Sequence, residues 1–470
     1  MGWKQLAACL ATAFVATTAL AAEPWAEKTN ALGASGKEVS GKLTAAELEK
    51  LIATGEELFI ARYTVNDGAG RPAATQAIVP TKRRHPVQNA FSRTSGADGN
   101  ACSSCHREPV VGGAGDFTAN VFASEGFESA DFDTTDPQFS SERGTNHLFG
   151  AGLIELLARE MTADLQSIRR DALLEAHKSG KSQRVKLETK GVDFGWLTVE
   201  PDGIADMSEL DGVDMDLVIR PFSQKGVITS LRQFTINAMN QHHGMQPNER
   251  YGKRWTGTDD FDEDNFPDEM NAGDVSALVA WQATRPVPTR QVPDIEGWAE
   301  AAARGEELFN STGCSSCHME SLPLKSPVFD DPGPVDVSGT LNRDQVKEVA
   351  SYDLSLLPWF KTLPRNEKGE VLVPLFGDLK RHTMTDARGE ELGNELMAQR
   401  FVDRNIFMTA ELWGVGSTAP YGHRNDFTTL DSIILAHAGD AREQRDAFAD
   451  LPEADRSAMI AFLKTLVIEQ

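Results

Sequence analysis

The sequence predicts a mainly α-helical protein of two related domains packed around an inter-domain interface, with long loops and few short strands. One five-residue cysteine motif occurs twice, and similar segments flank both copies in the same order, which indicates an internal duplication. Apolar residues near both motifs recur at helical spacing. A chain of 470 residues is long enough for two or three domains that each bury a core.

Both motifs have the spacing Cys-x-x-Cys-His. They are Cys102-Ser-Ser-Cys105-His106 and Cys314-Ser-Ser-Cys317-His318. This spacing is typical of c-type haem, in which two thiols bond to the porphyrin and the adjoining histidine binds the iron. A thioredoxin-like dithiol, a four-cysteine zinc site or a disulfide framework would not need a histidine after each pair. We therefore expect two cytochrome c-like domains with covalently bound haem, called haem 1 and haem 2, ligated by His106 and His318.

Matching helical segments surround the motifs. Gly-Glu-Glu-Leu-Phe occurs at residues 55–59 and again at 305–309, and apolar residues such as Leu48 and Leu51 share a helix face with the first copy. Each half also ends in a similar alanine-containing helix. We expect Asp274 and Asp455 to cap the N-termini of these two final helices.

The repeat defines the domain boundaries. We predict an N-terminal domain at residues 22–288, which carries haem 1 and insertions, and a C-terminal domain at residues 289–470, which carries haem 2. The boundary falls in a Pro-rich polar stretch at residues 286–293. A long insertion containing glycine and proline separates Phe59 from the first motif.

The N-terminus predicts export. Residues 1–21 combine Lys4, an apolar run and the small-residue sequence Ala19-Leu20-Ala21, which is typical of a signal peptide cleaved near Ala21. No later stretch is long and apolar enough to predict a membrane span. We expect a periplasmic protein, in agreement with c-type haem attachment. The net charge of -24 argues against nucleic acid as a partner. It agrees with a small basic redox protein as the partner.

Histidines outside the motifs are candidate sixth ligands. His437 follows Leu430, Ile433 and Ile434 on one predicted helix face, where a haem has to be covered, so we expect it to bind the haem 2 iron. A histidine packed in the core is the alternative. His382 and Met384 are the next candidates for this iron.

The first repeat offers a less defined partner. His242-His243-Gly244 corresponds to His437-Ala-Gly439, so His242 or His243 is a candidate ligand of haem 1. The equal alternative is that these histidines lie in a surface turn before Pro247 and bind no iron. Methionine also ligates haem iron, which adds three further candidates: Met245, Met384 and Met408.

Two acidic features are candidate sites. Asp260, Asp262 and Asp264 place oxygen atoms at alternate positions, with Asn265 at the turn, as in a calcium loop. A solvated acidic loop is the alternative. Glu155, on a predicted helix, is a candidate catalytic residue for moving protons at the haem 1 distal face, although exposed helix glutamates are commoner.

Taken together, these residues resemble the bacterial di-haem cytochrome c peroxidase superfamily, and in particular its branch of di-haem oxidoreductases and peroxidases. The resemblance runs from about Leu43 to the C-terminus. Besides both haem motifs, it rests on an ordered set of segments: Leu-Phe-Gly-Ala-Gly-Leu-Ile-Glu at 148–155, Leu-Trp-Gly-Val-Gly at 412–416, Thr-Ala-Pro-Tyr at 418–421 and His437-x-Gly.

The resemblance implies unequal haems. Haem 1 would react with hydrogen peroxide or another small oxidant, and haem 2 would relay electrons. The relay's sixth ligand lies 19 residues after the Thr of the Thr-Ala-Pro segment, and counting from Thr418 gives His437. This chain therefore resembles members with a bis-histidine relay haem.

Three departures separate the chain from the peroxidase pattern. The asparagine that helps to hold an inter-domain calcium is Gly144 here, and a His-Asp-Gly segment is His423-Arg424-Asn425. The position of the inter-haem tryptophan falls on Arg159. These differences weaken the expectation of that calcium and of a directly transferred mechanism.

The sequence thus predicts a periplasmic di-haem oxidoreductase of the peroxidase type that exchanges electrons with a small redox protein. A non-catalytic electron-transfer cytochrome is the first alternative. A di-haem oxygenase or cofactor-maturation enzyme is the second. The three differ in the coordination of haem 1 and in its reaction with peroxide.

Overall fold

The computed structural model describes residue 32 and residues 38–70, 99–123, 140–336, 341–394 and 402–469. The predicted signal peptide and residues 71–98 of the predicted insertion lie outside the described residues. About 40% of the structure is helical and 16% is strand. None of the described helices is both long and apolar enough to cross a bilayer.

A crossed helix pair lies next to the first motif. Helix α1 (Ala45–Ile60) begins with a capping box between Thr44 and Glu47, and it packs on α6 (Ala272–Ala283). The two backbones come so close that a Cβ atom at Gly55 would lie 2.0 Å from the carbonyl oxygen of Ala277. Phe59 then stacks on Trp281 with ring centroids 4.1 Å apart. Glycine is therefore required at this crossing.

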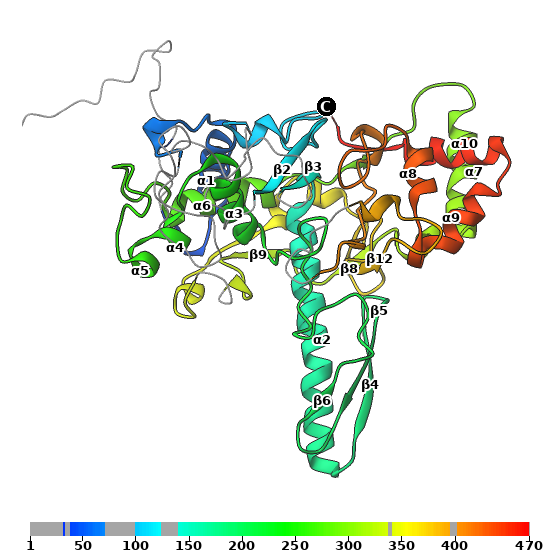
Figure 1. Ribbon diagram of the computed structural model, residues 1–470, viewed down its shortest axis with the longest axis horizontal. Helices are drawn as coiled ribbons and strands as arrows, with labels where there is room; N and C mark the ends of the chain where they lie inside the picture. The colour runs from blue at the N-terminus through cyan, green and yellow to red at the C-terminus, as the bar shows by residue number, and fades with distance from the viewer. Residues whose placement is uncertain are drawn as a thin grey trace, which may run out of the picture.

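A second pair repeats this arrangement. Helix α7 (Trp298–Ser311) packs on α10 (Glu453–Leu463), and a Cβ atom at Gly305 would lie 2.0 Å from the carbonyl oxygen of Ala458. The rings of Phe309 and Phe462 are 5.5 Å apart. Figure 1 shows one pair on each side of the molecule, and each pair lies in one of the predicted halves. The domain boundaries themselves stay a prediction.

A third helix also has a counterpart in each half. Helix α3 (Leu231–His243) follows an isolated bridge between Phe222 and Ile228, and α8 (Leu430–Ala436) follows the bridge between Tyr421 and Phe427. Ser230 and Thr429 cap the two helices with their side chains. The histidines nominated as sixth ligands stand at the C-terminal ends of these helices.

An elongated arm extends from the body of the molecule. It consists of α2 (Ala151–Ser179) and an antiparallel sheet of β4 (Gln183–Thr189), β5 (Val192–Val199) and β6 (Ala205–Asp206) (Figure 1). Leu187 and Phe194 are fully buried in the packing of this arm. The sequence did not predict this sheet.

Short strands connect the other segments. Among the described residues there are fourteen strands in six small sheets, more than the few that were expected. β1 (Gly41–Lys42) pairs with β10 (Ala350–Asp353), and the core that contains Leu43 also contains Leu354, so residues of both predicted halves share it. The remaining bounds are β2 (Thr118–Ala123), β3 (Ser140–Gly144), α4 (Asn248–Tyr251), α5 (Lys253–Thr256), β7 (Thr289–Arg290), β8 (Leu322–Leu324), β9 (Val328–Asp331), β11 (Val371–Val373), β12 (Arg381–Thr383), β13 (Ile406–Met408), α9 (Arg442–Ala449) and β14 (Leu466–Val467).

The predicted caps of the final helices are wrong by three residues. Asn271 caps α6, because its side chain accepts hydrogen bonds from the first-turn N–H groups, and Asp274 completes the capping box from inside the helix. Pro452 precedes α10, and Asp455 lies in its first turn, where it pairs with Arg304.

Candidate haem sites

The two cysteine motifs adopt the same backbone conformation. Each begins as one turn of 3₁₀ helix, Cys102–Ser104 and Cys314–Ser316. The N–H groups of His106 and His318 donate to the carbonyls of Cys102 and Cys314, both at 3.0 Å. None of the four motif cysteines forms a disulfide. A tight turn that presents two thiols and a histidine fits the donor set of a c-type haem.

The second motif faces a second histidine. His318 Nδ1 lies 3.2 Å from the carbonyl oxygen of Phe376, and His437 Nδ1 lies 2.8 Å from that of Ile433. When each Nδ1–H donates to its carbonyl, both Nε2 atoms remain as ligands, and the ring orientations are fixed. Burial lowers the pKa of His318 to about 4, with a further contribution from the nearby His437. Burial also lowers the pKa of His437. Both rings are therefore neutral, as iron ligation requires.

The other candidate at this motif is engaged elsewhere. His382, on β12, lies with Nε2 2.9 Å from an Asp378 carboxylate oxygen. Burial lowers its pKa, but hydrogen bonds to Asp378 and Cys317 outweigh burial and raise the pKa to about 10. One ring nitrogen of His382 is thus occupied by Asp378. Cys317, Asp378 and His382 lie close enough to hold a metal ion, but Cys317 belongs to the haem attachment motif.

The first motif faces the C-terminal end of α3. His243 is buried, and its Nε2 atom lies 3.5 Å from Cys102 Sγ. Burial lowers the pKa of His106 to about 4, and the nearby His242 acts in the same direction. The structure thus brings both nominated histidines to this motif and does not select one. Met245, which follows α3, is also fully buried.

Comparison with known proteins supports one family. Residues 359–466 match the family described as "Di-haem oxidoreductase, putative peroxidase". The chain is 23% identical over 378 residues to the cytochrome-c peroxidase IdrP2 of Denitromonas iodatirespirans, an overlap of 80% of this chain and 78% of that protein. The family match and this relative both support the resemblance to the di-haem peroxidase superfamily.

Two solved structures are similar to this chain at lower sequence identity. Hydrazine synthase of Kuenenia stuttgartiensis, pressurized with xenon, is 13% identical, with 99% of this chain and 100% of that chain covered at a TM-score of 0.39. A MauG-like protein associated with microbial copper homeostasis is 15% identical, with 57% and 78% covered at a TM-score of 0.27. Similarity this low carries no argument about fold or function.

Two of the departures from the superfamily pattern, Gly144 and Asn425, lie next to each other. A Cβ atom at Gly144 would lie 2.0 Å from Asn425 Oδ1, so Asn425 fills the space beside that glycine. Asn425 Nδ2 donates to the carbonyls of Gly115 and Phe117, at 3.3 and 3.2 Å. The neighbouring Arg424 pairs with Glu142. Direct contacts between the two predicted halves therefore stand where the resemblance implied a calcium ion.

The position that the resemblance assigned to the inter-haem tryptophan is part of an ion pair. Arg159 Nη2 lies 2.5 Å from Glu155 Oε1, and the guanidinium lies 4.5 Å from the centroid of the Phe329 ring. Glu155 Oε2 also accepts the N–H of Leu231, at 2.8 Å, and so caps the start of α3. Burial raises the pKa of Glu155 to about 7 against the opposing effect of Arg159. Its hydrogen bonds go to Arg159 and to the start of α3, and its catalytic role stays a prediction.

Trp413 contacts segments of both candidate haem sites, and sequence reasoning did not single it out. It is buried, its carbonyl oxygen lies 2.9 Å from His147 Nε2, and its indole packs against Gly150. The backbone N–H of Trp413 donates to the carbonyl oxygen of Leu375. The next residue, Phe376, has its carbonyl oxygen 3.2 Å from His318 Nδ1. The motif at residues 412–416 contained this tryptophan, but only the tertiary contacts show where it lies.

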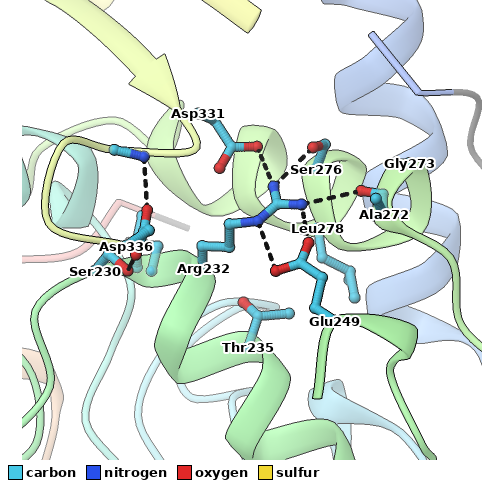
Figure 2. Close-up of polar contacts among 12 residues, drawn as sticks. Ser230, Arg232, Thr235, Glu249, Ala272, Gly273, Ser276, Leu278, Asp331 and Asp336 are labelled. Carbon is cyan, nitrogen blue, oxygen red and sulfur yellow. Dashed lines mark hydrogen bonds and ion pairs between the residues drawn. The ribbon is translucent and has the colours of Figure 1, made fainter. Parts of the chain in front are cut away.

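A buried ionic network lies beside these sites. Figure 2 shows the Arg232 guanidinium between Asp331, Ser276 and Glu249. The distances to Asp331 Oδ2 and Ser276 Oγ are 2.8 and 2.9 Å. Asp336 accepts from Ser230 at 2.5 Å next to it. The network joins α3 and α6 of the first predicted half to the end of β9 in the second.

The three aspartates of the candidate calcium loop come together as predicted by their spacing. Carboxylate oxygens of Asp260, Asp262 and Asp264 all lie within 4.8 Å of one another. Burial, followed by the charges of Asp264 and Asp260, raises the pKa of Asp262 to about 8. Whether a cation binds there stays a proposal.

Proposed function

We propose that this protein is an exported, periplasmic oxidoreductase that reduces hydrogen peroxide or a related small oxidant at haem 1 and takes electrons through haem 2 from a small redox protein. The observation that carries the proposal is the difference between the two motifs. The second faces one neutral histidine, whereas the first faces two candidates at the end of α3. When bound, the haems supply iron that can react with peroxide and exchange electrons.

The residues of the second site are arranged for electron transfer. His318 and His437 would both hold haem 2, each oriented by a carbonyl oxygen. A haem with two protein ligands has no open position, which favours electron transfer over reaction with peroxide. This site therefore fits the relay.

The first site is the better candidate for peroxide. His106 would hold haem 1, and the first motif lies beside the C-terminal end of α3, where His243 Nε2 is 3.5 Å from Cys102 Sγ. Because α3 ends at Gly244 in a left-handed conformation, the segment carrying His242 and His243 borders a turn rather than a continuing helix. A change of conformation at this turn would move His242 and His243 relative to the first motif.

Trp413 and His147 offer a path between the sites. The chain of contacts runs from the residues that orient His318 through Trp413 to His147, which lies near His106. Each turnover needs two electrons and two protons to convert one hydrogen peroxide into two water molecules, so haem 1 depends on electrons that arrive from haem 2. We expect Trp413→Phe to slow electron transfer between the haems while both haem spectra are retained.

The test combines turnover with spin state. We expect peroxide-dependent oxidation of a reduced small cytochrome or dye by the holoprotein, at least after one-electron reduction. His437→Ala should convert haem 2 from low to high spin in electron paramagnetic resonance, and exposed His177→Ala should change neither haem. Absence of turnover after reductive activation would contradict the proposed function. A low-spin haem 2 in His437→Ala would assign its ligand elsewhere.

The contact between His243 and Cys102 favours one second candidate, an electron-transfer cytochrome. If His243 binds the haem 1 iron permanently, both haems have two protein ligands. Both would then be low-spin at every redox state, without reaction with peroxide, cyanide or carbon monoxide. The same spectra separate the two functions.

A further inference from the structure

The loop between α5 and α6 gathers acidic side chains at one point. Asp260, Asp262 and Asp264 alternate along it, and their carboxylate oxygens lie within 4.8 Å of one another. The N–H groups of Asp264 and Asn265 donate to the Asp260 carboxylate, at 3.2 and 3.0 Å. Asn265 has a φ of 75°, the left-handed conformation that turns the chain back toward the carboxylates. The loop thus surrounds its own acidic groups.

Asp262 sets this loop apart from an ordinary acidic surface. Its exposed fraction is 0%, and neither of its carboxylate oxygens accepts a hydrogen bond of normal geometry, so only weaker contacts with the N–H groups of Asp262 and Asp264 oppose the rise of its pKa. The charged groups that act on it most strongly, Asp264 and Asp260, carry the same sign. A buried carboxylate without a hydrogen bond of normal geometry, beside two others, needs either a proton or a cation. The two neighbouring carboxylates make a cation the better fit.

We propose that this loop binds a hard divalent cation, best suited to Ca²⁺, with Asp260, Asp262 and Asp264 as carboxylate ligands. Ca²⁺ accepts six to eight oxygen ligands in irregular geometry, and a short loop supplies these from carboxylates, backbone carbonyls and water. Mg²⁺ demands a near-ideal octahedron and gives up water reluctantly, which fits an irregular loop less well. This site is separate from the inter-domain position next to Gly144.

The loop is attached to the segment that follows α3. Glu269 Oε2 accepts the N–H of Gln246 at 2.7 Å, and the N–H of Asn248 donates to the carbonyl of Met270 at 2.9 Å. Gln246 and Asn248 come directly after the end of α3, where His242 and His243 lie. A cation that orders the loop would therefore hold this end of α3 in place. This second role rests on the proposed function, in which one of these histidines controls haem 1.

Calcium binding is tested on the full-length holoprotein. After treatment with a chelator, isothermal titration with Ca²⁺ should show one site, and terbium should give sensitised luminescence that Ca²⁺ displaces. We expect Asp262→Asn to weaken binding at least about tenfold. The matched control Asp259→Asn removes an exposed carboxylate that pairs with Lys253, and it should change affinity less than about threefold. Failure of wild-type protein to bind Ca²⁺ at millimolar concentration, or unchanged binding by Asp262→Asn, would overturn the proposal.

Wild-type protein alone gives a second measurement if Asp262→Asn does not fold. Its thermal midpoint should rise with the logarithm of free Ca²⁺, because the cation binds only the folded chain. A midpoint independent of Ca²⁺ would overturn the site.

The link to α3 has its own readout. Removal of Ca²⁺ should speed hydrogen exchange at residues 244–248 and alter the haem 1 spectrum, with haem 2 unchanged. Binding of Ca²⁺ without faster exchange on its removal would overturn the role at α3. Peroxide turnover enters neither measurement, so the calcium site and the peroxidase proposal can fail separately.

Discussion

Gly144 and Asn425 occupy one small volume between the two predicted halves. Alanine at position 144 would place its Cβ 2.0 Å from Asn425 Oδ1, so one of the two segments has to move. We expect Gly144→Ala to lower the free energy of unfolding by about 1–3 kcal/mol, as overpacking does in other proteins. Denaturant unfolding of the holoprotein measures this change.

A double-mutant cycle isolates the contact between these residues. Asn425→Gly should cost stability by itself, because its amide bonds Gly115 and Phe117, but Gly144→Ala should be far less harmful in the Asn425→Gly background. Gly377→Ala is the control, since its Cβ would meet no atom closer than 3.6 Å. Equal costs of Gly144→Ala in both backgrounds would contradict the geometry.

His147 makes the stability of the protein depend on pH. Burial lowers its pKa from 6.5 to about 4, against the hydrogen bond to Trp413. Unfolding therefore takes up a proton between these values. The stability contributed by the neutral ring is fully present above pH 6.5 and is lost as the pH falls toward 4.

His147→Gln keeps a donor for the Trp413 carbonyl but does not titrate. We expect the stability of wild-type protein to fall more steeply than that of His147→Gln between pH 6.5 and 4, by up to about 1.4 kcal/mol per pH unit. The same replacement at exposed His177 serves as a control. Parallel curves for wild type and His147→Gln would show that His147 is not held neutral.

At the scale of elements, the two helix crossings are the same contact made twice. Alanine at Gly305 would place its Cβ 2.0 Å from a backbone carbonyl oxygen of α10, and a rigid helix cannot yield as a side chain can. We expect Gly305→Ala to destabilise the α7–α10 pair by about 1–3 kcal/mol. Thermal unfolding followed at the haem 2 absorption is the measurement, and Gly377→Ala is again the control. An unchanged midpoint would mean that the helices separate freely.

The sequence predicted those elements whose signal is local. Leu48, Leu51 and Leu58 predicted the buried face of α1 correctly, and all three are buried. The strands β4 and β5 also carried a local signal, an alternation of apolar and charged residues from Val185 to Glu188, but it was not recognised. The expectation of few strands was wrong for this reason and because two- and three-residue strands have too short a pattern to detect.

The candidate site also contains residues with a local signal in the sequence and residues without one. The cysteine motifs and His437 could be nominated because attachment chemistry and helix spacing give them a signal in the sequence, and their role as haem ligands stays a prediction. Trp413 and Asn425 could not be identified, since their significance depends on residues more than 250 positions away, as in the hydrogen bond between Trp413 and His147. Glu155 was nominated without its two partners, the Arg159 side chain and the N–H group of Leu231. The contact with Leu231 joins residues that are far apart in the sequence, so it could not be predicted.

At the scale of the whole molecule, Arg232 balances charges from both predicted halves. It is buried among Glu249 and Asp331, which are also buried, and both carboxylates raise its pKa against the effect of burial. Arg232→Met would leave these carboxylates without their cation. We expect a loss of about 3–5 kcal/mol, or failure to fold, measured by denaturant unfolding.

A surface arginine gives the comparison for this prediction. Arg304 pairs with Asp455 at 3.1 Å, but its side chain is 51% exposed. Arg304→Met should cost less than about 1 kcal/mol. Similar costs for the two substitutions would show that the Arg232 network does not hold the halves together.

The packing of Asn425 against Gly144 also restricts the order in which these residues can be exchanged during evolution. Asparagine at both positions would place two side chains in one volume. A lineage with asparagine at 144 therefore has to adopt a smaller residue there before asparagine becomes acceptable at 425. Glycine at position 144 is therefore the substitution that permits asparagine at position 425. Once Asn425 is present, asparagine cannot return to position 144 until Asn425 has been replaced.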